Sequence, residues 1–155
     1  MKMEIFNYNM AERYTGVEDY VLISILDPGN EITLQHDNKR KALLTLHFSD
    51  VDDIEFAKKM KYTLMSKEQA IEVKNFVDIW KDKVDYFIVH CTGGVCRSPG
   101  MGAAILEYVT GDASEILSSN RYIPNKYVYK LTLDTLKGLE EYNPEEIFKD
   151  ENKTY

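Results

Sequence analysis

The sequence predicts an α/β protein with a central, mostly parallel, twisted sheet of about four to five strands flanked by helices. β-prone runs alternate along the chain with segments of helical periodicity, and one apolar run leads directly into a helix start. Such alternation is typical of strands joined by crossover helices, which pair in parallel. We therefore expect functional residues beyond the carboxyl ends of the strands, where ligands bind in these sheets.

The expected strands are short runs of β-branched, aromatic and aliphatic residues. Three lie in the N-terminal part of the chain, at residues 3–8, 20–26 and 42–48, and a fourth lies at 84–89. The second run is followed by Asp27-Pro28-Gly29-Asn30, which is a strong turn signal. The fourth run is mostly apolar, so we expect a buried strand there.

Helices are expected where a capping residue precedes apolar residues that recur every three to four positions. Ser66 and Gln69 match a capping box, and the apolar residues that follow them recur at helical spacing: Ala70, Val73, Phe76, Val77 and Trp80. Further helices are predicted at residues 98–109, 112–119 and about 125–139. Pro99 fits the first turn of its helix, because the N–H that proline lacks has no partner there.

Length and composition indicate one domain over residues 1–155, with a polar acidic tail at 142–155. The net charge of −7 argues against nucleic acid or an anionic membrane as the main partner, since both require a basic surface. The N-terminus lacks the apolar core of a signal peptide, and no apolar run is long enough to cross a bilayer. We expect a cytoplasmic, monomeric protein with neither a metal nor another cofactor.

The stretch HCTGGVCRSPG, residues 90–100, joins the fourth expected strand to a helix N-terminus. Unpaired amides and the helix dipole favour an anion at such a junction. Gly93 and Gly94 permit positive φ, so successive amides from Thr92 to Arg97, Val95 and Cys96 included, can converge on one tetrahedral oxyanion. The planar guanidinium of Arg97 suits two phosphate oxygens. The composition of this loop predicts a phosphate site.

Cys91 lies at the base of the same loop, where the dipole, the amides and Arg97 stabilise a thiolate. A thiolate facing a bound phosphate monoester is placed to form a phosphocysteine, and the Ser98 hydroxyl can assist departure of the sulfur. Cys96 is either a packing residue or a resolving thiol for an oxidised Cys91. A structural disulfide is disfavoured, because the two cysteines would close only a very short loop.

His90 and Cys91 to Ser98 match the His-Cys-X5-Arg-Ser/Thr signature and so resemble the cysteine-dependent protein tyrosine phosphatases. The remainder resembles the small microbial dual-specificity-like members, through VLISILDPG, HFSDVDD and Pro124-Asn125. Locally, CTGGVCRSP also resembles the loop of low-molecular-weight tyrosine phosphatases. Those proteins carry their loop near the N-terminus, so chain order favours the dual-specificity-like type. The resemblance implies a tyrosine-phosphatase-like fold.

The resemblance also implies an aspartate general acid on the loop that follows the strand at 42–48. Asp50 matches this place best, and it lies further before Cys91 than in typical dual-specificity phosphatases. Asp53 is the second choice, and Asp52 and Asp27 remain open. A solvated acidic loop without a catalytic role is the competing interpretation of this aspartate cluster.

The expected function is hydrolysis of phosphotyrosine in a phosphorylated protein or peptide, and a dual specificity that extends to phosphoserine and phosphothreonine is left open. The loop holds no lysine, which disfavours phosphoinositides. An arsenate reductase usually needs a further cysteine outside the loop, and none exists here. The alternatives left open are an arsenate-reductase-like thiol enzyme and a phosphoprotein-binding module without turnover. A weaker alternative is a rhodanese-type sulfur transferase, which also places a cysteine in an amide-lined loop.

Overall fold

The computed structural model describes residues 1–139, and the tail predicted at 142–155 lies outside them. Strands and helices alternate in the order β1 (Lys2–Phe6), α1 (Tyr8–Arg13), β2 (Tyr20–Leu26), β3 (Arg40–His47), α2 (Ile54–Met60), α3 (Lys67–Trp80), β4 (Tyr86–His90), α4 (Arg97–Thr110), α5 (Ser114–Leu117) and α6 (Lys126–Leu136). Each expected strand and helix is present with shifted ends, except that β2 has the predicted bounds.

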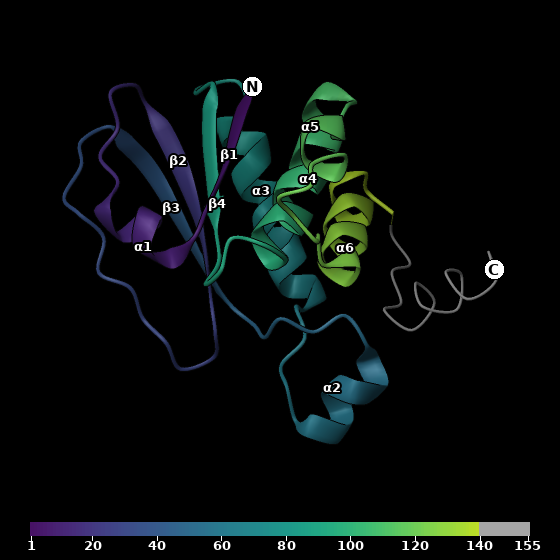
Figure 1. The fold of residues 1–155 in the computed structure, drawn as a ribbon. Coiled ribbons are helices and arrows are strands. Elements are labelled where there is room, and N and C mark those ends of the chain that lie inside the picture. Colours follow the sequence, from purple (N-terminus) through teal and green to yellow (C-terminus); the bar gives the residue numbers. More distant parts are fainter. Residues whose placement is uncertain (140–155) are drawn as a thin grey trace.

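The four strands form one sheet in the order β1-β4-β2-β3, and every neighbouring pair is parallel (Figure 1). The predicted α/β class with a mostly parallel sheet is confirmed. All seven residues of β2 are buried, as expected for a central parallel strand that is covered on both faces. The edge strand β3 alternates between exposed and more buried positions over most of its length.

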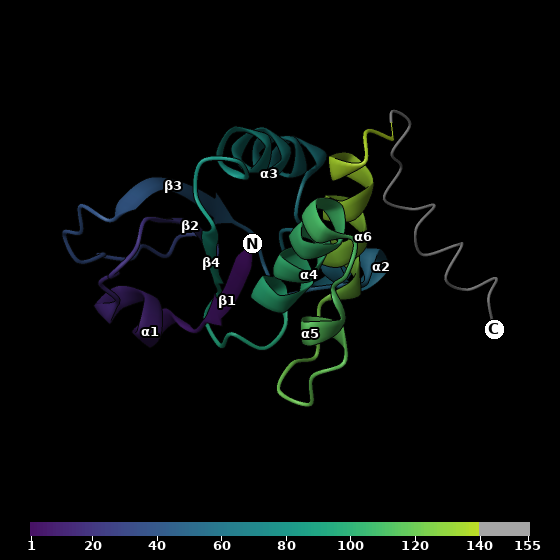
Figure 2. The same ribbon diagram turned by 90° about the horizontal axis from the view of Figure 1, so that it is seen from above.

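Helix α1 lies on one side of the sheet, and α3 and α4 lie on the other (Figure 2). An apolar cluster packs on each face. Val21, Ile23 and Ile25 of β2 belong to the larger cluster, together with residues of α3, α4 and α6. Tyr20 and Leu22 belong to the smaller cluster with Ala11 of α1. The period of two along the strand thus sends alternate side chains to opposite layers.

The capping box that begins α3 is present as predicted, because Ser66 and Gln69 bond each other's backbone amides. Helices α1 and α2 were not expected from the sequence. Asn7 caps the first and Asp53 caps the second, each through a side-chain oxygen. Both helices are shorter than two full turns, too short for an apolar period to be recognised.

Helix α4 packs closely against the start of α6. A Cβ atom on Gly100 would lie 2.7 Å from the carbonyl oxygen of Asn125, so only glycine allows this approach. Residues 97–106 of α4 are all buried, which places its N-terminus inside the molecule. Within residues 1–139, no helix is both long and apolar enough to cross a membrane.

Candidate active site

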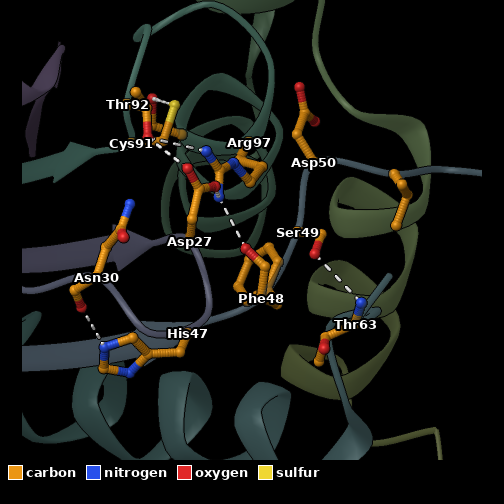
Figure 3. A network of polar contacts seen from close by, with 12 residues as sticks. Asp27, Asn30, His47, Phe48, Ser49, Asp50, Thr63, Cys91, Thr92 and Arg97 are labelled. Carbon is orange, nitrogen blue, oxygen red and sulfur yellow. Dashed lines mark hydrogen bonds and ion pairs between the residues drawn. The ribbon is translucent and has the colours of Figure 1, made fainter. Parts of the chain in front are cut away.

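The carboxyl ends of the parallel strands meet at one edge of the sheet, and a candidate functional residue follows three of them directly or closely. Asp27 follows β2, Asp50 lies beyond β3, and Cys91 follows β4. Figure 3 shows these three residues around the guanidinium of Arg97. The edge at which ligands bind in such sheets therefore gathers the residues that the sequence singled out.

Three carbonyl groups of the loop between β4 and α4 accept hydrogen bonds from residues outside the loop. The carbonyls of Thr92, Val95 and Cys96 accept hydrogen bonds from backbone amides of Tyr8, Ile123 and Asn125, at 3.1, 2.9 and 2.8 Å. Because these carbonyls point outward, amides of the same loop are free to face inward. This is the backbone arrangement that an oxyanion needs.

The sulfur of Cys91 lies within hydrogen-bond distance of two donors. The amide of Gly94 donates to Sγ at 3.3 Å, and the hydroxyl of Ser98 lies 3.1 Å from it. Cys91 is only 2% exposed, so little water competes for these contacts. The Gly94 amide and the Ser98 hydroxyl are therefore the groups that lie in reach of the sulfur.

His90 supports the loop from below. Its Nδ1 lies 3.2 Å from the carbonyl oxygen of Cys91 and must donate to it, and its Nε2 then accepts from the Ser24 hydroxyl at 2.6 Å. Burial, together with the nearby charge of Arg97, lowers the pKa of His90 below 6.5. The ring is therefore neutral at neutral pH and holds the loop rather than accepting the thiol proton.

The Arg97 side chain is only 5% exposed and has three oxygen partners. Its Nη1 lies 2.7 Å from a carboxylate oxygen of Asp27 and donates to the carbonyl of Phe48 at 2.7 Å. Its Nη2 donates to the hydroxyl of Thr92 at 3.2 Å. These contacts lock the plane of the guanidinium beside the loop, as Figure 3 shows.

The N-terminus of α4 carries no side-chain cap, whereas α1, α2, α3 and α6 each have one. Its first amides are thus available to an anion. Gly94 adopts a φ of +67°, as the loop requires. Both loop glycines permit positive φ, and of the two only Gly94 adopts it. One left-handed residue is enough to turn the backbone around the sulfur.

Asp50 is anchored by a residue far along the chain. Its Oδ1 accepts from Nδ2 of Asn125 at 3.0 Å, and the same nitrogen donates to the carbonyl of Val51 at 3.1 Å. Asn125 is 5% exposed and also caps α6 through its Oδ1. Asp50 is therefore held next to the loop between β4 and α4, whose Cys96 carbonyl accepts a hydrogen bond from the Asn125 amide.

The other candidate aspartates have different surroundings. Asp53 accepts from the amide of Phe56 at 3.0 Å, so its side chain is used as the cap of α2. Asp52 is exposed. Asp27 is engaged with Arg97, and one of its oxygens also lies 3.5 Å from the Thr92 hydroxyl. Of the four, Asp50 is the carboxyl near the loop that is engaged neither as a helix cap nor by the arginine.

The site has two features that sequence reasoning did not assign. It left Asp27 open as an acid and did not foresee an ion pair with Arg97, since no local pattern connects the two. It also did not foresee that Asn125 contacts Asp50. The only sequence signal was the position of Asn125 after Pro124, which is typical of a helix start.

Cys96 and Cys91 are both free cysteines. Burial, followed by repulsion from Asp50, raises the pKa of Cys96 to about 11. Cys96 therefore remains a thiol at neutral pH, and a thiol is a poor nucleophile. In residues 1–139, no group of three or more His, Cys, Asp or Glu side chains is placed to hold a metal ion.

No protein-family model and no curated protein sequence matches the chain. Among solved structures, it is similar to the human tyrosine phosphatase-like serine/threonine/tyrosine-interacting protein, with a TM-score of 0.56 and 15% identity over 86% of this chain and 89% of that one. It is also similar to Tk-PTP in the active form, with a TM-score of 0.46 and 19% identity over 79% and 80% of the two chains. The arrangement of its parallel sheet and flanking helices is thus a tyrosine-phosphatase-like fold.

Proposed function

We propose that this protein is a tyrosine phosphatase that hydrolyses phosphate monoesters of phosphorylated proteins through a phosphocysteine on Cys91. One observation carries the proposal. The Cys91 sulfur accepts a hydrogen bond from the Gly94 amide and faces the Ser98 hydroxyl. The carbonyls of the loop around it accept hydrogen bonds from residues outside the loop. This arrangement stabilises a thiolate and leaves room for phosphate oxygens on the inward amides.

In the first step, the Cys91 thiolate attacks phosphorus and the P–O ester bond breaks. The leaving oxygen takes the bonding pair and receives a proton from the Asp50 carboxyl group. The loop amides from Thr92 to Arg97 and the Arg97 guanidinium hold the remaining phosphate oxygens. The product alcohol or phenol leaves, and the phosphoryl group stays on sulfur.

In the second step, a water molecule attacks phosphorus and gives a proton to the Asp50 carboxylate. The P–S bond breaks, and the electron pair returns to sulfur as a thiolate. The Ser98 hydroxyl, 3.1 Å from Sγ, donates to the departing thiolate and stabilises it. Inorganic phosphate is released, and the enzyme returns to its starting state.

Hydrolysis of p-nitrophenyl phosphate tests the nucleophile and the phosphate ligand. Cys91→Ser and Arg97→Ala are expected to lose nearly all activity, because the first removes the thiolate and the second removes the guanidinium. Asp52→Asn is the matched control, since Asp52 is exposed and has no assigned role. Full activity of Cys91→Ser would contradict the covalent mechanism. Binding of phosphate by an inactive wild-type protein would instead support a phosphoprotein-binding module.

The same assay identifies the acid. Asp50→Asn is expected to lower kcat by about 10²–10⁴ and to flatten the basic limb of the pH–rate profile, because no proton donor remains. Asp27→Asn is expected to weaken phosphate binding while the basic limb persists, since Asp27 orients Arg97. If Asp27→Asn alone removed the basic limb, the two roles would have to be exchanged.

A further inference from the structure

A cleft of about 570 Å³ adjoins the candidate active site and is not used by the proposed chemistry. Its lining comes from three segments: the turn after β2 (Asp27 and Pro28), the segment after β3 (Ser49, Asp50 and Val51), and α2 with the residues that follow it (Phe56, Lys61, Tyr62 and Thr63). Asp27 pairs with Arg97, and Asp50 is the proposed acid. The cleft therefore begins where the leaving group of a bound substrate would lie.

The far wall of this cleft is aromatic. The rings of Phe56 and Tyr62 lie 5.9 Å apart between centroids and are tilted by 48° to each other. Phe56 is 48% exposed and Tyr62 is 47% exposed, so a large part of both side chains faces solvent. An exposed aromatic pair that lines a cleft next to a catalytic site favours contact with an apolar group of a substrate.

Lys61 adds a positive charge to the same wall. Among the described residues, its ammonium group makes no ion pair or side-chain hydrogen bond. Its backbone adopts φ 59° and ψ 34° at the end of α2, a conformation that usually takes glycine or asparagine. Lys61 is the one non-glycine residue with positive φ in the described part of the chain. A lysine at this place costs stability and supplies a cation to the cleft.

The other charged groups that line the cleft are already engaged. The carboxylate of Asp27 is paired with Arg97, and the side chain of Asp50 accepts a hydrogen bond from Asn125. Lys61 is thus the cation of the cleft lining that has no ion-pair partner among the described residues, although the whole chain has a net charge of −7. A preference for an acidic substrate would run against the long-range field and would have to arise locally.

We propose that this cleft binds the polypeptide flank of the substrate, with an acidic residue on Lys61 and an apolar side chain on Phe56 and Tyr62. The inference rests on the proposed function and names its substrate class: a phosphotyrosyl peptide with acidic and apolar residues beside the phosphotyrosine. Lys61 and the aromatic pair determine specificity and take no part in bond breaking.

Two phosphotyrosyl peptides that differ only in having glutamate or glutamine on both sides of the phosphotyrosine provide the test. Binding to the Cys91→Ser variant is measured by fluorescence anisotropy, so that turnover does not enter. The glutamate peptide is expected to bind about threefold more tightly, as a single partly exposed ion pair allows. Equal binding of the two peptides would overturn the proposal.

The Lys61→Gly variant, in the same Cys91→Ser background, is expected to bind both peptides equally. Glycine suits the left-handed backbone at this place, so a folding defect is not expected from the substitution. Lys59→Gln is the matched control, because Lys59 is an exposed lysine of α2 that does not line the cleft. A preference that survives Lys61→Gly, or that disappears with Lys59→Gln, would overturn the assignment to Lys61.

Two further measurements separate the parts of the proposal. The glutamate preference should decline as NaCl is raised from 50 to 500 mM, because salt screens an exposed ion pair, and a salt-insensitive preference would contradict the ionic contact. Phe56→Ala should weaken the binding of both peptides by the same factor. Unchanged affinities would exclude the aromatic contact. Failure of the proposed function would appear instead as a wild-type protein that does not hydrolyse the peptides. The binding measurements do not depend on hydrolysis, so the two failures can be told apart.

Discussion

The imidazole of His90 illustrates, at the scale of one residue, how a buried group supports the loop without reacting. It bridges Ser24 on β2 and the Cys91 carbonyl, and it is completely buried. Protonation would place a charge in this interior and would remove the acceptor that Nε2 offers to Ser24. Its contribution to stability is therefore tied to its neutral form.

The stability of the folded protein depends on pH through this imidazole. The pKa of His90 is lowered in the folded state, so the unfolded chain binds the proton more readily below about pH 6.5. The contribution of neutral His90 is fully present above that pH and is lost as the pH falls through the window below it. We expect the free energy of unfolding to decrease from about pH 6.5 to 5, by at most about 1.4 kcal/mol per pH unit from this residue.

Urea unfolding at several pH values measures this effect. His90→Gln should flatten the slope in this window even if it lowers stability at every pH. His36→Gln is the control, because His36 is exposed and should keep the wild-type slope. An unchanged slope in His90→Gln would mean that another group is responsible.

At the scale of the element, the loop between β4 and α4 depends on Gly94 more than on Gly93. Gly94 has a φ of +67°, and a Cβ atom there would lie 3.0 Å from the Phe6 carbonyl oxygen and the Asn7 amide. A Cβ atom on Gly93 would meet only Val95 Cγ2, at 3.9 Å. The end of β1 thus closes against the loop at Gly94.

Gly94→Ala is therefore expected to destabilise the protein by about 1–3 kcal/mol, because it combines a strained φ with a backbone clash. It should also remove most of the hydrolysis of p-nitrophenyl phosphate, since the Gly94 amide donates a hydrogen bond to the Cys91 sulfur. Gly93→Ala should change the free energy of unfolding by no more than about 0.5 kcal/mol. Denaturant unfolding and steady-state kinetics of both variants check this difference, and equal destabilisation would contradict it.

Elements were predictable from the sequence to the extent that their signals are local. The capping box at Ser66 and the β-branched run at 20–26 each lie within a few consecutive residues, and both were found. Helices α1 and α2 were missed, because six or seven residues give no clear period. The cleft wall that α2 provides was therefore beyond prediction as well.

At the scale of the whole molecule, Asn125 joins segments that lie far apart in the sequence. Its side chain contacts Asp50, 75 residues away, and caps α6, while its backbone amide bonds the phosphate loop at Cys96. The packing of α4 on α6 places it there, with Gly100 directly against its carbonyl. Asp50, the proposed general acid, and the loop that follows Cys91 are thus both held by one residue of a third segment.

Two substitutions separate the structural and positioning roles of Asn125. Asn125→Ala removes the helix cap and the contact with Asp50, and should cost about 1 kcal/mol or more of stability. Asn125→Ser keeps a capping oxygen but does not reach Asp50, so it should cost less stability. Both are expected to lower kcat by about tenfold and to shift the basic limb of the pH–rate profile, because Asp50 is no longer held. A wild-type profile for Asn125→Ser would show that Asn125 is structural alone.

The sequence by itself determined the class of the fold and which candidate residues lie together in the loop after β4. Cys91, Ser98 and Arg97 lie within eight residues between a strand and a helix, so their proximity follows from chain connectivity. Only the tertiary structure decided the rest: that Asp27 pairs with Arg97, that Asn125 holds Asp50, and that α2 forms a cleft wall. These contacts join separate strands and helices across the sheet edge, and such distances are set by packing, which no local pattern of residues encodes.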